Sequence, residues 1–238
     1  MTEIPALWSY LAAAPLTWLT VTLLAYLAAA TLSQALHHTP LANPVLLAVI
    51  AIAALLTLTG TEYGTYFEGA QFIHFLLGPA TIALAVPLID NARTIRRVAA
   101  PILLALLAGS VVAVISTILL AKAFGLSGSV LLSLAPKSTT APVALGVAEA
   151  VGGIPSLTAV LVILTGIIGA ITVTPMMNAL RIRDWRARGF AVGVAAHGIG
   201  TARAFQVNET AGAYAGVGMA LNALLTSLLV PLIVAWLV

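Results

Sequence analysis

Long apolar runs alternate with short polar breaks along the whole chain. The runs cover residues 8–35, 43–60, 71–89, 98–121, 127–149, 155–180, 189–206 and 210–237. Several of them reach the roughly 20 residues that a helix needs to cross the hydrocarbon core of a bilayer. The pattern predicts an all-α, polytopic membrane protein with about seven or eight membrane segments. We expect it to form a single transmembrane domain over residues 1–238.

Composition supports the membrane assignment and excludes several classes of function. Hydrophobic residues make up 61% of the chain and charged residues only 7%, whereas about a quarter of a soluble domain is charged. The net charge of +3 does not indicate nucleic-acid binding, because the basic residues lie in short clusters and not on an aromatic-interleaved surface. The chain has no cysteine, so disulfides, thiol catalysis and cysteine-ligated metals are excluded.

Seven of the ten Lys and Arg residues form two clusters. The clusters are Arg93, Arg96 and Arg97, then Arg181, Arg183, Arg186 and Arg188. Arginine-rich loops of membrane proteins stay on the cytoplasmic side, so we expect both clusters to be cytoplasmic.

This orientation constrains the segment 127–149. If 98–121, 127–149 and 155–180 all crossed the membrane, the second arginine cluster would lie outside, against the charge rule. The conflict disappears if 127–149 enters part way and returns. Pro136 and Pro142 support this interpretation, because proline removes an amide donor and disrupts the preceding helical turn. We therefore predict a re-entrant, broken helix here.

Two further segments show similar breaks. Leu77–Thr81 aligns weakly with Leu134–Ser138, and Pro87 falls near Pro142 in the same alignment. Matching Gly/Pro-interrupted segments are typical of transporters that are built from repeats around a midplane site. Ala195–Arg203 is also interrupted, since its two glycines loosen a helix.

Lys137 is the leading candidate for a functional residue. A lone cation within an apolar stretch is costly and marks a site by default. Ser138, Thr139 and Thr140 follow it and add hydroxyl donors, and a half-helix that begins here would direct its positive end toward an anion. This donor set suits a carboxylate. The alternative is that Lys137 reaches to the interface and the hydroxyls only cap a helix.

Arg203, Thr201 and His197 form the second group of substrate-binding candidates. Arg203 could pair with a carboxylate through two hydrogen bonds, with Thr201 beside it, or form a salt bridge to Glu209. His197 could bind substrate or carry a coupled proton, or simply be a packing residue.

The other polar residues give weaker evidence for a functional site. His74, Glu149, Asn43 and Asn178 are weaker candidates. The four histidines are scattered and no zinc-binding helix motif occurs, so we expect no metal and no cofactor. Nucleophile-elbow, phosphate-loop and dinucleotide motifs are also missing from the sequence, so we expect no enzyme, and any transport must be secondary or rely on another subunit.

These motifs resemble the LrgB/CidB family, whose members have been called antiholin-like proteins. The matching features lie in Asn43–Leu47, Leu77–Pro87, Pro136–Pro142, Gly152–Pro155 and Arg188–Arg203, and they cover nearly the whole chain. The resemblance implies a bacterial inner-membrane protein that acts with a smaller LrgA/CidA-like membrane partner. The chain is also similar to the C-terminal half of the plastid glycolate/glycerate transporter, in which both parts are fused.

Two functions follow from the resemblance. Some relatives are linked to pyruvate or other short monocarboxylates, which implies a secondary carrier for acids such as glycolate, glycerate, pyruvate or lactate. The older interpretation of the family is control of murein hydrolase export and autolysis. A buried cation among broken helices favours the carrier, whereas a membrane-permeabilising regulator needs none. The expected partners are the carboxylate, the LrgA/CidA-like protein and membrane lipid, with a homodimer left open.

Overall fold

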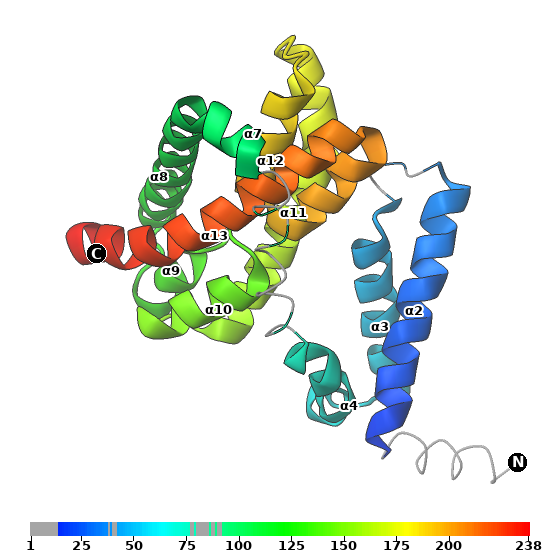
Figure 1. Ribbon diagram of the computed structural model, residues 1–238. Helices are drawn as coiled ribbons and strands as arrows, with labels where there is room; N and C mark the ends of the chain where they lie inside the picture. Colours follow the sequence, from blue (N-terminus) through cyan, green and yellow to red (C-terminus); the bar gives the residue numbers. More distant parts are fainter. Residues whose placement is uncertain are drawn as a thin grey trace, which may run out of the picture. The chain divides into compact units, whose positions relative to one another are not determined.

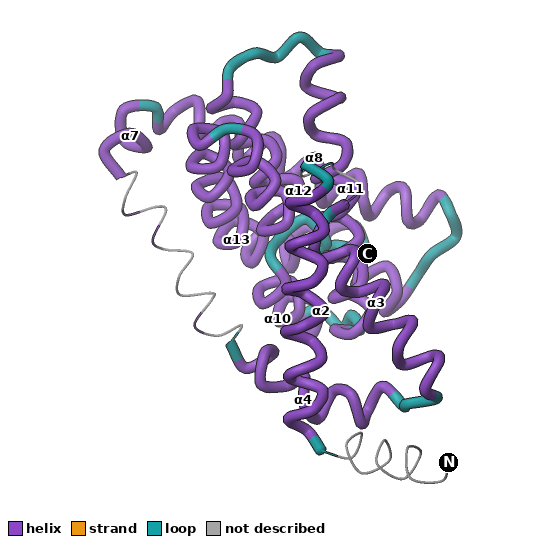
Figure 2. Tube along the Cα trace, turned by 90° about the vertical axis from the view of Figure 1, so that its right-hand side faces the viewer, coloured by secondary structure: helices purple, strands orange, loops and turns teal. Residues whose placement is uncertain are grey.

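The computed structural model describes residues 14–37, 39, 42–76, 79, 86, 89 and 92–238. The predicted broken segment Leu77–Pro87 lies mostly outside these residues. The chain divides into two units, Met1–Ala80 and Thr81–Val238. The described residues are helical or in connecting turns and contain no strand (Figure 2). This agrees with the all-α prediction.

The described residues of unit 1 form three helices. They are α2 (Pro15–Ala35), α3 (Pro44–Thr59) and α4 (Tyr63–Phe75). Asn43 caps α3 by accepting hydrogen bonds from the amides of Val45 and Leu46, and Gly60 ends the helix with a positive φ of 64°. Left-handed backbone at a helix end is where glycine is favoured. Both ends of α3 are therefore fixed by local chemistry.

The polar stretch from Gly60 to Glu68, whose composition is typical of a loop, is helical from Tyr63 onward. Helix α4 begins at Tyr63, and its first turns place Tyr66 against the fully buried Trp18 of α2. The two rings meet edge to face with centroids 5.9 Å apart, a favourable aromatic geometry. Packing of aromatic side chains at helical spacing thus outweighs the polar composition of this segment.

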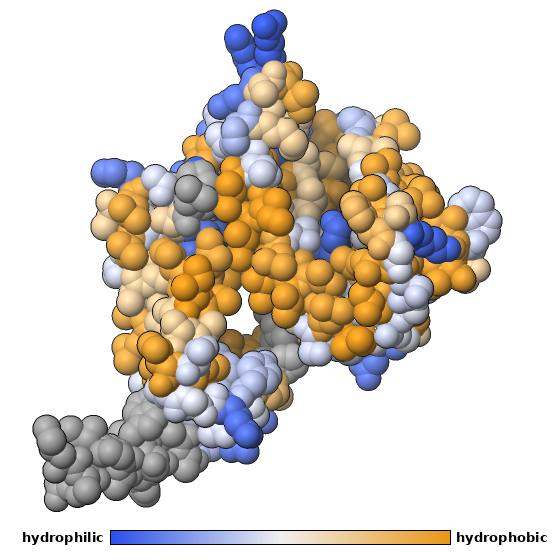
Figure 3. All heavy atoms as spheres, turned by 180° about the vertical axis from the view of Figure 1, so that it is seen from behind, coloured by the Kyte–Doolittle hydropathy of each residue, from blue (hydrophilic) through white to orange (hydrophobic). Residues whose placement is uncertain are grey.

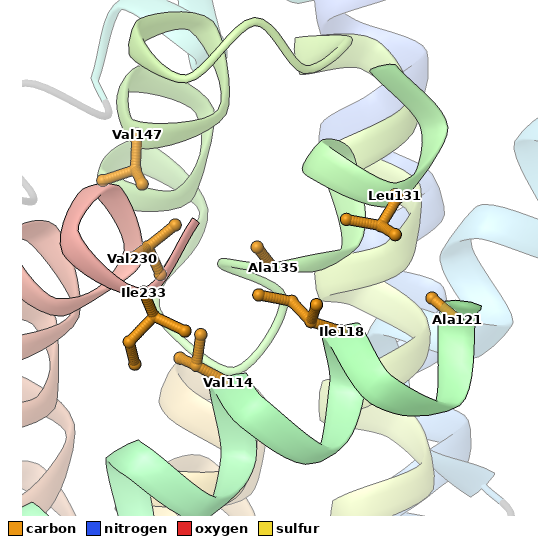
Figure 4. Packing of buried hydrophobic residues seen from close by; sticks show 8 residues of the cluster. All are labelled: Val114, Ile118, Ala121, Leu131, Ala135, Val147, Val230 and Ile233. Atoms are coloured by element: carbon orange, nitrogen blue, oxygen red, sulfur yellow. The ribbon is translucent and has the colours of Figure 1, made fainter. Parts of the chain in front are cut away.

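Unit 2 holds the remaining helices. They are α7 (Ala92–Arg97), α8 (Ala99–Ala123), α9 (Gly128–Leu134), α10 (Ala141–Ala150), α11 (Pro155–Ala179), α12 (Trp185–Val207) and α13 (Glu209–Leu237) (Figure 1). Helices α8, α9, α10 and α13 share a hydrophobic core, shown in Figure 4, to which Ile118, Leu131 and Val230 contribute almost fully buried side chains.

The exterior of the molecule is apolar. Four of the described helices (α2, α8, α11 and α13) are long and apolar enough to cross a membrane. Large side chains such as Leu104 and Leu228 are about two-thirds exposed, and hydrophobic residues cover much of the surface in Figure 3. Exposed apolar surface on this scale is incompatible with water and matches a lipid environment. The protein is a multi-pass membrane protein.

The two arginine clusters of unit 2 lie at the same end of it. Val98, directly after the first cluster, and Arg186 of the second cluster line one groove. The start of α8 and the end of α11 therefore share this end, which we call the arginine end. The far end of α8 lies at the opposite end, where Lys122 donates to the carbonyl of Leu237.

The segment between α8 and α11 consequently leaves and re-enters at the same end. Helices α9 and α10 within it have 7 and 10 residues, too few for either to span a bilayer. This is the re-entrant path that the charge rule predicted for 127–149.

Candidate functional site: the junction of two helical hairpins

The first hairpin is formed by α9 and α10, and its tip carries Lys137. After α9 the chain makes two tight turns, in which the amide of Lys137 bonds to the Leu134 carbonyl at 3.1 Å and that of Thr139 to the Pro136 carbonyl at 3.1 Å. Helix α10 then starts beyond Thr140, whose side chain makes no capping bond. The amide end of a half-helix, which attracts anions, thus lies beside Lys137.

Helix α12 forms a second hairpin by folding back on itself. Its backbone leaves helical geometry at Ala196 and at His197, where φ is 41° and ψ is −136°. In a straight helix residues eight apart are separated by about 12 Å, yet a Cβ at Gly200 would lie 2.8 Å from the Val192 side chain. Trp185 and Val207, at the two ends of α12, line the same pocket. His197 therefore sits at the tip of a hairpin that starts and ends at the arginine end.

Small residues make this fold-back possible. A Cβ added at Gly189 or Gly193 would overlap the backbone of Ala211 or Ala215 on α13, so glycine lets the first arm of α12 approach that helix closely. Gly166 of α11 does the same for the tip, since a Cβ there would lie 2.6 Å from the His197 ring. The strained backbone at His197 is a feature that folds retain mainly at functional sites.

Asn222 of α13 joins the two hairpin tips. Its side chain is 2% exposed, and its amide group donates to the carbonyl of Ser138 at 3.3 Å and to that of Val194 at 3.1 Å. Its carbonyl oxygen accepts from Ser110 of α8 at 2.6 Å and from Thr226 at 3.1 Å. The Asn222 amide group thus donates to both hairpin tips, while its carbonyl oxygen accepts from the long helices α8 and α13.

Five of the predicted site residues meet at this junction. Lys137 is half-buried and its ammonium lies 3.5 Å from the Ser138 hydroxyl. Thr139 is 1% exposed, and its hydroxyl has no hydrogen-bond partner within the described chain. Thr140 precedes α10 as its cap residue. His197 lies at the other tip, which Asn222 joins to this one, so both tips contribute ionisable groups to one region.

His197 is buried and its orientation is fixed. It is 4% exposed, and its Nε2 lies 2.9 Å from the Val162 carbonyl of α11. A carbonyl can only accept, so Nε2 carries a proton. In the neutral ring Nδ1 is then the acceptor, and it can receive a hydrogen bond or a proton.

Thr201 and Arg203 are not part of the group around Lys137. The Thr201 hydroxyl bonds to the His197 carbonyl at 2.8 Å and so satisfies a backbone group near the tip. Arg203 lines a separate small pocket with Trp185 and Arg188, and it donates to the Gln206 side chain at 3.3 Å. The structure thus places Arg203 toward the arginine end, away from Lys137.

Of the weaker site candidates, those that the structure describes lie away from the junction or have a local structural role. Asn43 caps α3, Asn178 accepts from Arg188 at 2.8 Å, and Glu149 is exposed. The side chain of His74 is outside the described residues. The described part of the chain holds no group of His, Asp and Glu suited to a metal ion.

Near Arg188, the loop that leads into α12 carries an ion pair. Asp184 caps α12 and accepts from the Arg186 guanidinium at 2.8 Å. The hydrogen bonds from Arg186 lower the pKa of Asp184 to about 2.

Sequence reasoning missed Asn222, Ser110 and Thr226. A signal was present, because Asn222 is a lone amide inside an apolar helix, and polar residues within membrane segments are costly and functional as a rule. The ring of contacts around it could not be derived without the fold.

The junction has the chemistry of an anion site. Two half-helices begin at the tips, one at Ala141 and one just after His197, so both direct their positive ends there. An ammonium and an unpaired buried hydroxyl add donors. In a low-dielectric interior, these groups could replace the water that a carboxylate loses.

Comparison with known proteins agrees with the motifs. Residues 22–236 match the model of the LrgB-like family. The chain is 40% identical to the uncharacterized protein YxaC of Bacillus subtilis strain 168, over 83% of this chain and 86% of that protein. It is 33% identical to the holin-like protein CidB of Staphylococcus epidermidis, with the same coverage, and to CidB of Staphylococcus aureus strain Mu50, over 84% and 88%. No solved structure matches the chain. The protein belongs to the LrgB-like family.

Proposed function

We propose that the protein is a secondary carrier, or the main subunit of one, for small monocarboxylates such as glycolate, glycerate, pyruvate or lactate. The observation that carries the proposal is the meeting of two half-helix amino ends, Lys137 and the unpaired Thr139 hydroxyl at the junction joined by Asn222. Broken helices whose positive ends face the substrate are the hallmark of secondary transporters.

The donors at the junction match a short acid. Lys137 neutralises the carboxylate, and the Thr139 hydroxyl and the first amides of the half-helices supply hydrogen bonds. His197 Nδ1 can accept from a substrate hydroxyl, because Nε2 already donates to Val162. A 2-hydroxy acid such as glycolate would use all of these groups.

Movement of the hairpins would alternate access to this site. The α9–α10 hairpin enters from one end of unit 2 and the α12 hairpin from the arginine end. A substrate between the tips is thus separated from each side by one hairpin. Opposed hairpins are what an inverted repeat produces, so they support the proposed repeat architecture, and we keep the prediction of seven to eight segments with it.

The remaining features of the proposal come from the family. We place the protein in the bacterial inner membrane with the arginine end cytoplasmic, as the charge rule requires. A small LrgA/CidA-like membrane protein is its proposed partner, and association as a homodimer is the alternative assembly.

A second function is favoured by the relatives. The name holin-like protein CidB, carried by relatives at 33% identity over most of the chain, supports a holin-like or antiholin-like role better than it supports a carrier. Such a protein would permeabilise the membrane, or restrain a partner that does, in the control of murein hydrolase export. It would conduct solutes of several kinds without saturation.

Uptake into proteoliposomes separates the two functions. Labelled glycolate, pyruvate and lactate are offered with and without the small partner, and an entrapped neutral dye reports leakage. A carrier gives saturable uptake without dye release, and Lys137→Ala abolishes it while the protein stays folded. Thr165→Ala is the control, because its hydroxyl bonds only within α11. Dye release, or normal uptake by Lys137→Ala, would refute the carrier.

A further inference from the structure

A groove at the arginine end of unit 2 lies apart from the hairpin junction. It has a volume of about 310 Å³ and is formed by the first turns of α8 and α12 together with α13. Its lining residues are Val98, Pro101, Ile102, Ala105, Arg186, Ala187, Phe190 and Tyr214. Its volume is at the lower end of the range of small-molecule pockets.

The floor of the groove is hydrophobic. Ile102 and Phe190 are each 7% exposed and belong to a core cluster with Leu106, Val194 and Val217. Pro101 and Ala105 are exposed along one wall. A hydrocarbon chain bound on this floor would cover only apolar side chains, and burying that apolar surface is favourable.

The rim of the groove is positively charged. Arg186 is 58% exposed and forms an ion pair with Asp184, and both Arg186 and Tyr214 line the groove. Asp184 accepts from the Nε and Nη2 of Arg186, and a guanidinium has five N–H donors in all. Arg96 and Arg97, both exposed, directly precede Val98. Three arginines and one carboxylate therefore lie near the rim, which leaves it with a net positive charge.

We propose that this groove is a binding site for an anionic phospholipid. One acyl chain lies on the floor formed by Ile102 and Phe190, and the phosphate is held at Arg186 and Tyr214. Basic pockets between membrane helices on the cytoplasmic side bind anionic headgroups, and the charge rule places this end there. The site is independent of the proposed carrier, since no junction residue lines it.

Native mass spectrometry of the full chain tests the proposal, because it resolves the first lipid bound. The detergent-solubilised protein is titrated with phosphatidylglycerol or with phosphatidylcholine of the same acyl chains. The first phosphatidylglycerol should bind about fivefold more tightly, the effect of roughly one arginine on an anionic headgroup. Arg186→Gln should remove this preference. Ala105→Trp, which fills an exposed wall position, should weaken the first binding of both lipids.

Matched variants control for charge and size. Arg183→Gln removes an exposed arginine of the same cluster that does not line the groove, and Ala100→Trp adds the same bulk on an exposed site of α8 outside it. Both should bind as the unmodified protein does. The proposal is overturned if the unmodified protein shows no headgroup preference, as a groove for a partner helix would. It also fails if each variant and its control bind alike.

Discussion

Asn222→Ala is the substitution that tests most directly whether one side chain holds the two hairpin tips together. It removes four hydrogen bonds at a residue that is 2% exposed. The hydroxyls of Ser110 and Thr226 can turn to a carbonyl of their own helix, as Thr117 does. The carbonyls of Ser138 and Val194 have no such substitute, because the helix is interrupted beside each.

The expected loss follows from those two carbonyls. An unsatisfied buried polar group costs about 1–3 kcal/mol, although interhelical hydrogen bonds in membranes average only about 0.6 kcal/mol. We therefore expect Asn222→Ala to lower the free energy of unfolding by about 2 kcal/mol. Asn222→Leu restores most of the lost volume but not the donors, so it should lose nearly as much. This pair separates hydrogen bonding from cavity formation.

The measurement combines stability with exposure of a tip. Unfolding by denaturing detergent in bicelles gives the free energy, and a single cysteine at Thr140 in this cysteine-free chain reports how often the tip opens. Asn222→Ala should label faster than the parent. Ser227→Ala is the control, since its hydroxyl bonds only to Leu224 on an exposed face of the same helix. Equal stability and equal labelling in the two variants would refute the role of Asn222.

Further predictions concern packing, pH and topology. Gly193→Ala should destabilise the protein by about 1–3 kcal/mol, because its Cβ would overlap the Ala215 carbonyl. Gly146→Ala, with nothing within 4 Å, should instead stabilise α10 by about 0.5–1 kcal/mol, and thermal unfolding compares the two. The lowered pKa of Asp184, about 2 because of Arg186, means that its stabilising contribution is present above the unfolded value of about 3.9 and is lost as pH falls through 2. The difference in melting temperature between the parent and Asp184→Asn should therefore shrink between pH 5 and pH 2. Single cysteines in either arginine cluster should react with an impermeant maleimide only from the cytoplasmic side, and labelling from outside would contradict the topology.

Apolar segments with sharp ends were predictable from the sequence. The runs 43–60, 155–180 and 210–237 match α3, α11 and α13 within a residue or two at each end, because proline or an asparagine cap fixes where each of these helices begins. The break around Lys137 was predictable too, from two prolines and the parity of the arginine clusters. In each case the deciding chemistry is local or depends on charge alone.

The second hairpin was only half predictable. Two glycines indicate that the helix is interrupted within 195–203. The same glycines are compatible with a kink and with a complete reversal of direction, so the sequence does not distinguish the two. The reversal depends on how closely Gly189 and Gly193 approach α13, which is a tertiary property. The sequence named both Arg203 and Lys137 as candidates for binding the substrate carboxylate. In the hairpin, Arg203 lies six residues along the returning arm and faces the pocket beside Trp185.

From the helix lengths we expect the junction to lie near the centre of the membrane. Helix α10 and the two arms of α12 have about ten residues each, or about 15 Å of helix. This is half of the roughly 30 Å hydrocarbon thickness. If the two hairpins enter the bilayer from opposite sides, arms of that length would meet near its midplane. Asn222 lies near the middle of the 29-residue α13, which starts at the arginine end and finishes beside Lys122. At that depth, a carboxylate beside Lys137 and His197 would depend on hydrogen-bond donors of the protein in place of water.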